Sequence, residues 1–246
     1  MHIAGLDLAA EPKGSALTIL HWSGHKAKVL EIAESVSDER ILRVATSVEK
    51  LGIDCALGWP IEFSEFIRAH SDITQYQDAF DGNIDWRRRL AYRDTDRQVR
   101  QATGHWPLSV STDRLSMTAL RCAGLMSQLR SVGHNVDRAG LGKIVEIYPA
   151  ASMRIWGLQF AGYRNSPDAR RSLLEDLIAG APWLELSGYE DLMIQSCDAF
   201  DSVIAALATL SVCLGKSTNP SDEDLATAQI EGWIHLPRST LGDLLN

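Results

Sequence analysis

The segment CDAFDSVIAALATL, residues 197–210, decides how the fold is interpreted, because an apolar helical pattern there contains two aspartates. Within a helix predicted over residues 189–214, Asp198 and Asp201 are three residues apart and therefore share one face. The same face continues through small residues such as Ala205, which allow a helix to approach a sheet closely. The two charges thus interrupt the stripe that should pack on a sheet.

A second interpretation of this pair is open. If the helix breaks near Ser196, Asp198 and Asp201 lie at a helix start, where acidic side chains interact favourably with the helix dipole. A single aspartate at the end of a strand is likewise most often a turn or cap residue. Acids occur in four separate segments where apolar residues are expected. This repetition favours a functional site built from acids over both of these explanations.

Three of these acids stand in apolar segments near the ends of predicted strands. They are Asp7 in IAGLDLA, Asp54 in GIDCAL and Glu146 in KIVEIYP. Central strands of parallel sheets are normally continuous apolar runs, and a charge within one is costly unless it is compensated. We therefore expect these carboxylates to converge on a common partner.

Turn residues and apolar runs predict three strands, a helix and a fourth strand at the start of the chain. The expected ranges are 2–9, 15–22 and 26–32 for the strands, 37–51 for the helix, which Gly52 ends, and 53–57 for the fourth strand. The pattern predicts a further strand over 143–148 and a helix after Ser166, and residues 231–237 are a candidate last strand.

Residues 58–142 differ from the rest, with few strand-like runs, many charges and one clear amphipathic helix from about 111–113 to Gly133. We interpret this region as a helical insertion within a single domain of residues 1–246. The predicted class is α/β, with a mixed sheet of three antiparallel strands followed by parallel strands and with helices flanking the sheet.

Composition limits the classes of function. The 246 residues are 45% hydrophobic and 23% charged, and the net charge of −8 argues against a protein that grips nucleic acid over its whole surface. The four cysteines are far apart and form no zinc pattern, so we expect reduced thiols. Apolar runs shorter than about 18 residues and an N-terminus without signal-peptide features predict a cytoplasmic protein with no membrane partner.

Acids brought together in this way repel one another. Two unit charges about 5 Å apart cost roughly 3 kcal/mol at an effective dielectric constant near 20. Either some carboxyls are protonated or a cation lies among them. Oxygen ligands without nearby cysteine or histidine favour Mg²⁺ or Mn²⁺, and pairs of such ions are a common means of hydrolysing phosphodiesters.

The order of the elements, with acids on the first strand, the fourth strand and the last helix, resembles the ribonuclease-H-like superfamily. Six short motifs occur in the order seen in a family of uncharacterised proteins, a domain of unknown function described as predicted ribonuclease-H-like nucleases. They are GLDLA (5–9), IDCALGWP (53–60), YRDTDR (92–97), EIYP (146–149), DAFDSVIAAL (198–207) and EGWI (231–234).

The resemblance implies a ribonuclease-H-like fold and metal-binding acids at Asp7, at Asp54 and at Asp201 or Asp198. Glu146 is implied as an extra member, either a ligand or a base that orients water. The familiar ribonuclease H and Holliday-junction resolvases lack a large insertion after the fourth strand, so this insertion is expected to set substrate choice or access.

A local basic segment, WRRRLAYRDTDRQVR at 86–100, holds six of the 24 basic residues. Helical spacing places Arg89, Arg93, Arg97 and Arg100 on one face, and arginine forks suit phosphate groups. The alternative is a solvated helix with internal ion pairs. Under the resemblance, a family motif is matched by Arg93, Thr95, Asp96 and Arg97, which favours a role at a cleft that binds nucleic acid.

The first functional hypothesis is therefore a divalent-metal-dependent nuclease or related phosphodiester hydrolase. The second is a protein that binds nucleic acid or a nucleotide on the same scaffold without turnover. An actin-like or sugar-kinase-like ATP-using protein is disfavoured by the short chain and by LDLAA, which lacks the expected glycine and hydroxyl residue. The oligomeric state is open, and a homodimer is compatible with the sequence.

Overall fold

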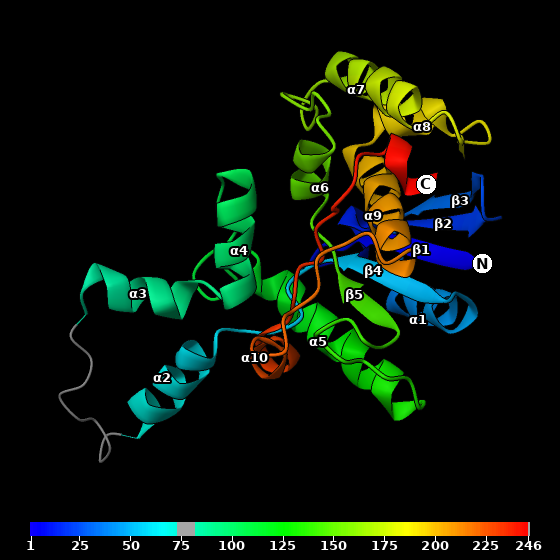
Figure 1. The fold of residues 1–246 in the computed structure, drawn as a ribbon. Coiled ribbons are helices and arrows are strands. Elements are labelled where there is room, and N and C mark those ends of the chain that lie inside the picture. The colour runs from blue at the N-terminus through cyan, green and yellow to red at the C-terminus, as the bar shows by residue number, and fades with distance from the viewer. Residues whose placement is uncertain (73–81, 246) are drawn as a thin grey trace.

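A six-stranded mixed sheet organises the computed structural model, which describes residues 1–72 and 82–245 (Figure 1). Its strand order is β5-β4-β1-β2-β3-β6. The first three strands are antiparallel neighbours, whereas β4 is parallel to β1, β5 to β4 and β6 to β3. The strands are β1 His2–Asp7, β2 Ala16–Trp22, β3 Ala27–Glu34, β4 Lys50–Asp54, β5 Ile144–Glu146 and β6 Leu184–Glu185. This confirms an α/β class with antiparallel strands followed by parallel ones.

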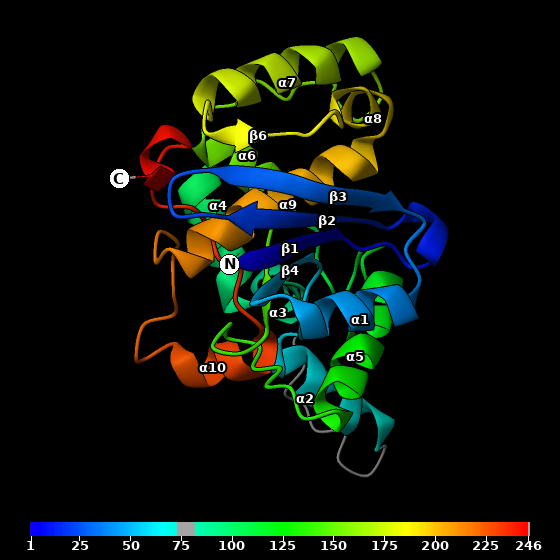
Figure 2. The same cartoon turned by 90° about the vertical axis from the view of Figure 1, so that its right-hand side faces the viewer.

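Helices cover both faces of the sheet. They are α1 Asp38–Ser47, α2 Ile61–Ser71, α3 Ile84–Ala91, α4 Asp94–Thr103, α5 Ser116–Ser131, α6 Pro149–Ile155, α7 Pro167–Gly180, α8 Glu190–Gln195, α9 Cys197–Cys213 and α10 Leu225–Glu231, with short 3-10 helices at Pro12–Gly14 and Gly242–Leu245. Helix α9 crosses β1, β2, β3 and β4, and α6 and α8 pack against it. Figure 2 shows β6 beneath α7 at one edge of the sheet.

The alternation of side chains along the strands divides the core in two. Ile3 of β1 packs in the cluster formed with α7 and α9, whereas Ala4 and Leu6 pack in the cluster formed with α1 and α5. Because side chains alternate with a period of two, Gly5 and Asp7 belong to the face that α9 covers. The sheet therefore presents the end of β1 to α9.

Helix α9 explains the mixed character of the segment that contains its two aspartates. Every residue from Ala199 to Ser211 is buried, since the sheet covers one side of the helix and α6 and α8 cover others. A helix that is apolar all round is a core helix. The predicted single helix over 189–214 is wrong: the chain breaks at Ser196, whose hydroxyl caps α9 by accepting from the amide of Ala199 at 3.1 Å.

Three further expectations need correction. Helix α1 ends at Ser47, and the fourth strand, expected over 53–57, is β4 at Lys50–Asp54, so Gly52 lies inside a strand rather than after a helix. The candidate strand at 231–237 forms only isolated bridges, at Ile234 and Pro237. The edge strand β6 was not expected, because two residues leave no readable alternation.

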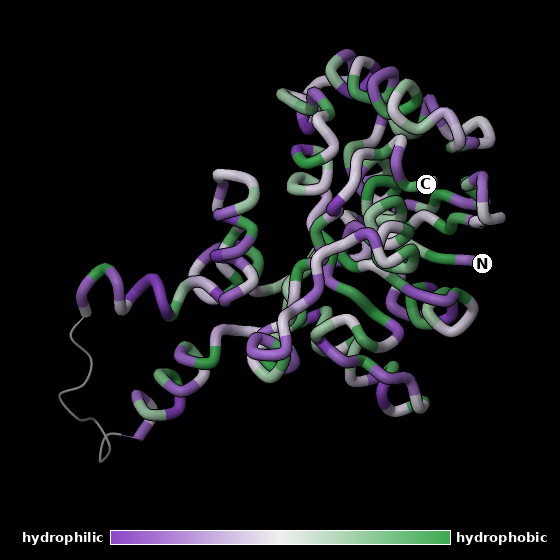
Figure 3. Tube along the Cα trace, viewed as in Figure 1, coloured by the Kyte–Doolittle hydropathy of each residue, from purple (hydrophilic) through white to green (hydrophobic). Residues whose placement is uncertain are grey.

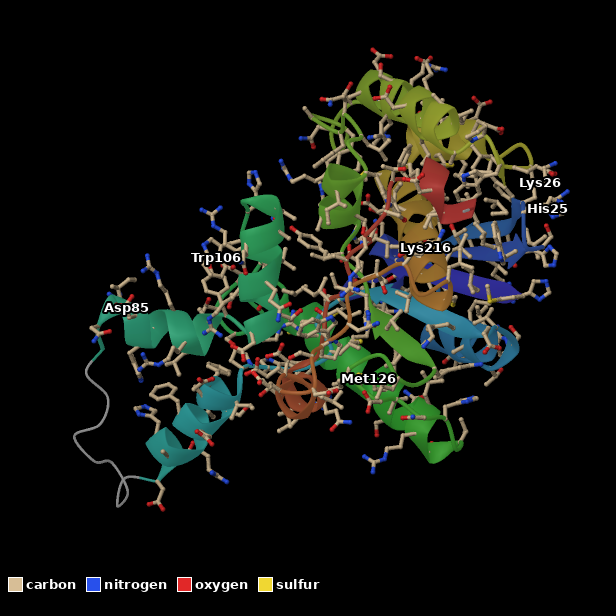
Figure 4. The ribbon with its side chains drawn as sticks, viewed as in Figure 1. His25, Lys26, Asp85, Trp106, Met126 and Lys216 are labelled. Carbon is tan, nitrogen blue, oxygen red and sulfur yellow. The ribbon has the colours of Figure 1, made fainter. Side chains whose placement is uncertain are left out.

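The described part of the predicted insertion at 58–142 contains α2, α3, α4 and α5, and residues 73–81 lie outside the described residues. Helix α5 returns to the sheet and buries Cys122, Leu125 and Leu129. Helices α2 and α3 instead project away from the sheet, and α3 is mainly hydrophilic (Figures 1 and 3). The side chains in Figure 4 show Asp85 on α3 and His25 at opposite ends of the molecule. That residues 1–246 form one domain stays a prediction.

Of the helices in residues 1–72 and 82–245, none has the length and apolar character needed to cross a bilayer.

Candidate functional site

Asp7 and Asp54 lie side by side where β1 and β4 end. The two strands are parallel, and the two aspartates are partners in the register. Neighbouring strands are about 4.8 Å apart, so paired residues present their side chains on the same face of the sheet. That face is the one covered by α9, because Leu51 and Ile53 of β4 point into the opposite core.

Helix α9 reaches this point because its backbone touches β1. A Cβ atom at Gly5 would collide with the backbone nitrogen of Ala206, so only glycine permits this approach. A buried hydrogen bond of 2.7 Å between the hydroxyls of Thr18 and Ser202 ties the helix to β2 as well. The first turns of α9 are thereby held beside the ends of the central strands.

Asp201 is the most enclosed acid of this group, with 3% of its surface exposed. The Tyr163 hydroxyl lies within donating distance of both carboxylate oxygens, at 2.9 and 3.1 Å. The Cys197 thiol donates to Oδ2 at 3.7 Å. Asp198 is half-buried in the first turn of α9, which is the favourable dipole position that a break at Ser196 implies.

Burial and mutual repulsion shift the protonation of these acids. Burial, together with the charges of neighbouring aspartates, raises the pKa of Asp7 to about 9 and that of Asp54 to about 8. Burial raises the pKa of Asp201 to about 6, although Arg164 and the Tyr163 hydrogen bond oppose the shift. Burial also raises the pKa of Asp198. We call these four residues the aspartate cluster; its charges are only partly compensated.

Arg164 is the positively charged side chain beside the aspartate cluster. Its guanidinium opposes the upward pKa shift of each of the four aspartates and lies 3.7 Å from Asp201 Oδ2. In the described part of the chain, no other basic side chain is among the main charges that act on these acids. The side chain of Arg164 is 59% exposed, so it stands at the rim of the cluster.

Arg170 of α7 holds the loop that carries Tyr163 and Arg164. Its buried guanidinium donates to the carbonyl oxygens of Tyr163 and Ile194, each at 2.6 Å, and to that of Gln195 at 3.1 Å. The loop is therefore fastened to the turn that precedes α9. Sequence reasoning missed all three residues, because no motif or periodicity distinguishes them.

Glu146 lies in a different environment from the aspartate cluster. Its partner in the register is Ile53 rather than Asp54, so its side chain points to the other face of the sheet. Arg93 forms a two-fold ion pair with it, at 2.8 Å from Nη1 to Oε2 and 2.7 Å from Nη2 to Oε1. The amide of Leu57 donates to Oε2 at 3.0 Å, which fixes the chain just after Asp54.

Arg93 is buried at 2% exposure and also binds Asp96, at 2.8 Å from Nη2 to Oδ1. Glu231 completes this group: its two oxygens accept from the first amides of α2 and α4, those of Ile61 at 2.8 Å and Asp94 at 2.9 Å. Its backbone oxygen accepts from Arg93 Nη1 at 3.1 Å. We call Arg93, Asp96, Glu146 and Glu231 the arginine-centred group.

The remaining residues of the basic segment do not share one helical face, because the chain breaks between α3 and α4 at Tyr92 and Arg93. Arg89 is exposed on α3, and Arg97 on α4 pairs with Asp94 at 2.6 Å. Thr95 is buried, and its hydroxyl accepts from the amide of Ile234 at 2.8 Å. Arg93 and Thr95 therefore contact the protein interior, whereas Arg89 and Arg97 reach solvent.

The donor chemistry of the aspartate cluster fits a hard cation, since carboxylate oxygens are the ligands that Mg²⁺ and Mn²⁺ prefer. As the side chains stand within residues 1–72 and 82–245, however, no three acidic, histidine or cysteine groups form a closed metal centre. Asp201 is turned toward Tyr163. Cation binding at this site would therefore require the carboxylates to rotate toward one another.

Comparison with known protein families matches residues 5–225 to a family described as protein of unknown function (DUF429). No curated protein and no solved structure matches the chain significantly. The matched residues include both edge strands of the sheet, β5 and β6, and all four residues of the aspartate cluster.

Proposed function

We propose that this chain, which belongs to the DUF429 family, is a divalent-metal-dependent nuclease or a related phosphodiester hydrolase that acts on nucleic acid. The observation that carries the proposal is the meeting of Asp7, Asp54 and Asp201 at the ends of two strands and a helix. Acids held this close repel one another, and Mg²⁺ or Mn²⁺ would relieve the repulsion that protons otherwise relieve.

The resemblance to the ribonuclease-H-like superfamily supports this proposal. The resemblance implies three antiparallel strands, then parallel strands, with acids on the first strand, the fourth strand and a late helix. The order of β1 to β5 and the position of α9 are compatible with that arrangement. Fold alone does not specify chemistry, so the functional argument depends on the acids themselves.

Each residue of the cluster has a proposed task. Asp7 and Asp54 hold the cation from the strands, and Asp201 and Asp198 hold it from α9. The cation, when bound, supplies an activated water and stabilises charge on the phosphate. Glu146 acts as a positioning residue, because its bond to the Leu57 amide fixes the chain after Asp54, whereas Asp201 would have to exchange its contact with the Tyr163 hydroxyl for the cation.

Substrate contacts are proposed for the exposed part of the basic segment. Arg89 and Arg97 reach solvent and can approach a phosphate backbone, while Arg93 and Thr95 hold α4 in place. The proposed partner is therefore nucleic acid that lies between the aspartate cluster and the projecting helices α2 and α3.

Cleavage assays with labelled RNA, DNA and junction substrates in Mn²⁺ or Mg²⁺ test the proposal. We expect Asp54→Asn to abolish metal-dependent cleavage while the protein remains folded. Asp222→Asn, which removes an exposed acid outside the cluster, is the matched control and should cleave like the wild type. Failure of the wild type to cleave any of these substrates would contradict the proposal.

A second candidate function is binding of nucleic acid or a nucleotide without turnover. The Tyr163 hydroxyl, within reach of both oxygens of Asp201, favours it, because this contact competes with a cation for those oxygens. Titration calorimetry with Mn²⁺ separates the two candidates. Heat of binding that disappears in Asp54→Asn supports the hydrolase, and absence of binding in the wild type supports the second candidate.

A further inference from the structure

We propose that Arg164 is a phosphate-binding residue, which contacts the phosphodiester group of a nucleic-acid strand positioned at the aspartate cluster. This inference rests on the proposed function, since it assigns the substrate contact of the same site. Three independent features support it: the exposure of the guanidinium, the anchoring of its loop and the charge balance of the cluster.

The first feature is that the guanidinium of Arg164 is accessible. Its side chain is 59% exposed, its contact with Asp201 is long at 3.7 Å, and its guanidinium carbon lies 5.8 Å from the centre of the Tyr163 ring. Arg93, by comparison, has 2% of its surface exposed and uses its guanidinium on two carboxylates and a backbone oxygen. The guanidinium of Arg164 thus lies over the Tyr163 ring and beside Asp201 while it still faces solvent.

The second feature is that the backbone of Arg164 is held at the site. The carbonyl of the preceding residue, Tyr163, accepts from Arg170 Nη1 at 2.6 Å. The same guanidinium also donates to the carbonyl oxygens of Ile194 and Gln195, which directly precede Ser196, the cap of α9. A residue whose loop is fastened in this way can place a charge at a defined position without a large loss of conformational freedom on binding.

The third feature is charge balance at the cluster. A phosphodiester that approaches four carboxyl groups meets repulsion, even when a divalent cation neutralises part of their charge. Arginine supplies planar, paired donors that match phosphate oxygens. Arg164 lies 3.7 Å from Asp201 Oδ2 and, among the basic residues that the structure describes, is the one whose charge acts on all four aspartates, so it is placed to compensate the incoming phosphate.

The competing explanation is that Arg164 only neutralises the carboxylates. The two explanations differ in the nucleic-acid affinity that they predict when Arg164 is removed. A neutralising arginine competes with the cation, so its removal tightens Mn²⁺ binding and leaves nucleic-acid affinity unchanged. A phosphate-binding arginine contributes to nucleic-acid affinity, so its removal weakens binding of the strand.

The experiment uses the full-length protein and two probes, a fluorescein-labelled 20-nucleotide single-stranded RNA and a DNA duplex of the same sequence. Binding is measured by fluorescence anisotropy at several salt concentrations in the Asp54→Asn background, in which cleavage is not expected. Arg164→Met is compared with Arg164→Lys and with Arg171→Met, which removes an exposed arginine from α7. Thermal melting verifies that each variant is folded.

We expect Arg164→Met to weaken binding of at least one probe about five- to twentyfold and to reduce the slope of log K against log salt by about 0.7–0.9. Arg164→Lys should recover part of the affinity, and Arg171→Met should match its parent. Unchanged affinity and slope in Arg164→Met would overturn the inference, as would a parent protein that binds neither probe. Calorimetry with Mn²⁺ on the wild type tests the proposed function separately, because it requires no nucleic acid.

Discussion

The aspartate cluster and the arginine-centred group are two sets of buried acids at the same end of the sheet, and they differ in what neutralises them. In the arginine-centred group, a buried arginine forms charge-assisted hydrogen bonds with two carboxylates, and helix amides satisfy a third. Burial raises the pKa values of Glu146 and Glu231 too, but Arg93 and backbone amides oppose those shifts directly. In the aspartate cluster, burial raises the pKa values of all four acids, and among the described basic side chains only the exposed Arg164 at the rim is a main opposing charge.

This difference distinguishes a structural use of buried charge from a functional one. A fully hydrogen-bonded ion pair holds segments together, and here it connects α4, β5 and the chain around Glu231. Acids that are buried without a matching internal cation destabilise the fold, and they are retained where a ligand completes the charge balance. The same residue type thus has opposite consequences at two places on one sheet.

The largest expected effect is that of removing the cation from the arginine-centred group. Arg93→Met leaves Asp96 and Glu146 buried without their partner, which typically costs roughly 3–5 kcal/mol. We expect the melting temperature to fall by about 6–20 °C. Arg97→Met, which removes a partly exposed arginine paired with Asp94, is the control and should change it by less than about 2 °C. Equal effects of the two substitutions would contradict the comparison.

Metal binding should distinguish the groups next. Mn²⁺ at about 100 times its dissociation constant is expected to stabilise the wild type by about 2.7 kcal/mol. Because the pKa values of Asp7 and Asp54 are raised to about 9 and 8, Mn²⁺ must displace protons, and its effect should be larger at pH 8 than at pH 6. Thermal melts with and without Mn²⁺ measure this. Asp54→Asn should lose the effect, whereas persistence in that variant would place the metal elsewhere.

Removing one acid from each group should change stability in opposite directions in metal-free buffer. The pKa of Asp7 is higher in the folded protein, so the folded state holds more protons than the unfolded chain, and stability falls as pH rises from about 4 to about 9. Asp7→Asn removes this penalty. We expect a gain of about 1–2 kcal/mol at pH 8, the equivalent of one or two pKa units, and little change near pH 4.

The paired measurement is Glu146→Gln. Burial raises the pKa of Glu146 as well, but Arg93 and the Leu57 amide oppose that shift, so removing the charge leaves Arg93 buried with one carboxylate fewer and should lower stability at pH 8. Urea unfolding at pH 8 and at pH 4.5 gives both values. Stabilisation by both substitutions, or by neither, would show that the two groups are not different in kind.

The smallest effect is expected on the projecting helix α3. Arg89 is exposed there, so Arg89→Ala should alter the free energy of unfolding by no more than about 0.5 kcal/mol. If α3 contacts nucleic acid, binding of a labelled oligonucleotide should weaken two- to threefold, with a smaller salt slope. Fluorescence anisotropy measures this, and unchanged affinity would remove Arg89 from the proposed contacts.

The sequence predicted those helices and strands whose capping residues or side-chain alternation can be recognised within a short segment. Ser37 and Ser166 cap α1 and α7, at the starts that the predicted helix over 37–51 and the predicted helix after Ser166 give, and each stands before an acidic first turn. The alternation around Asp7 predicted a first strand, which β1 confirms, and the register pairs Asp7 with Asp54 at the end of β4. These predictions succeeded because capping and strand alternation depend on neighbours in the chain.

Other assignments required the register of strands and the packing of helices. Glu146 resembles Asp54 in sequence context, yet its pairing with Ile53 turns it to the opposite face. Arg93 has the spacing of a surface arginine, although it is buried between two carboxylates. A shift of one residue in register reverses the face of every side chain, and no pattern within a single strand reveals it.

By itself, the sequence determined the α/β class, the strands that carry Asp7 and Asp54, and the presence of acids in an apolar helix, because these depend on local propensity and periodicity. Tertiary structure alone decided which acids share a neighbourhood, which arginine neutralises them and which remains exposed. The physical reason is that the electrostatic energy of a buried charge depends on distances between segments far apart in the chain, such as Arg164 and Asp201 or Arg93 and Glu146.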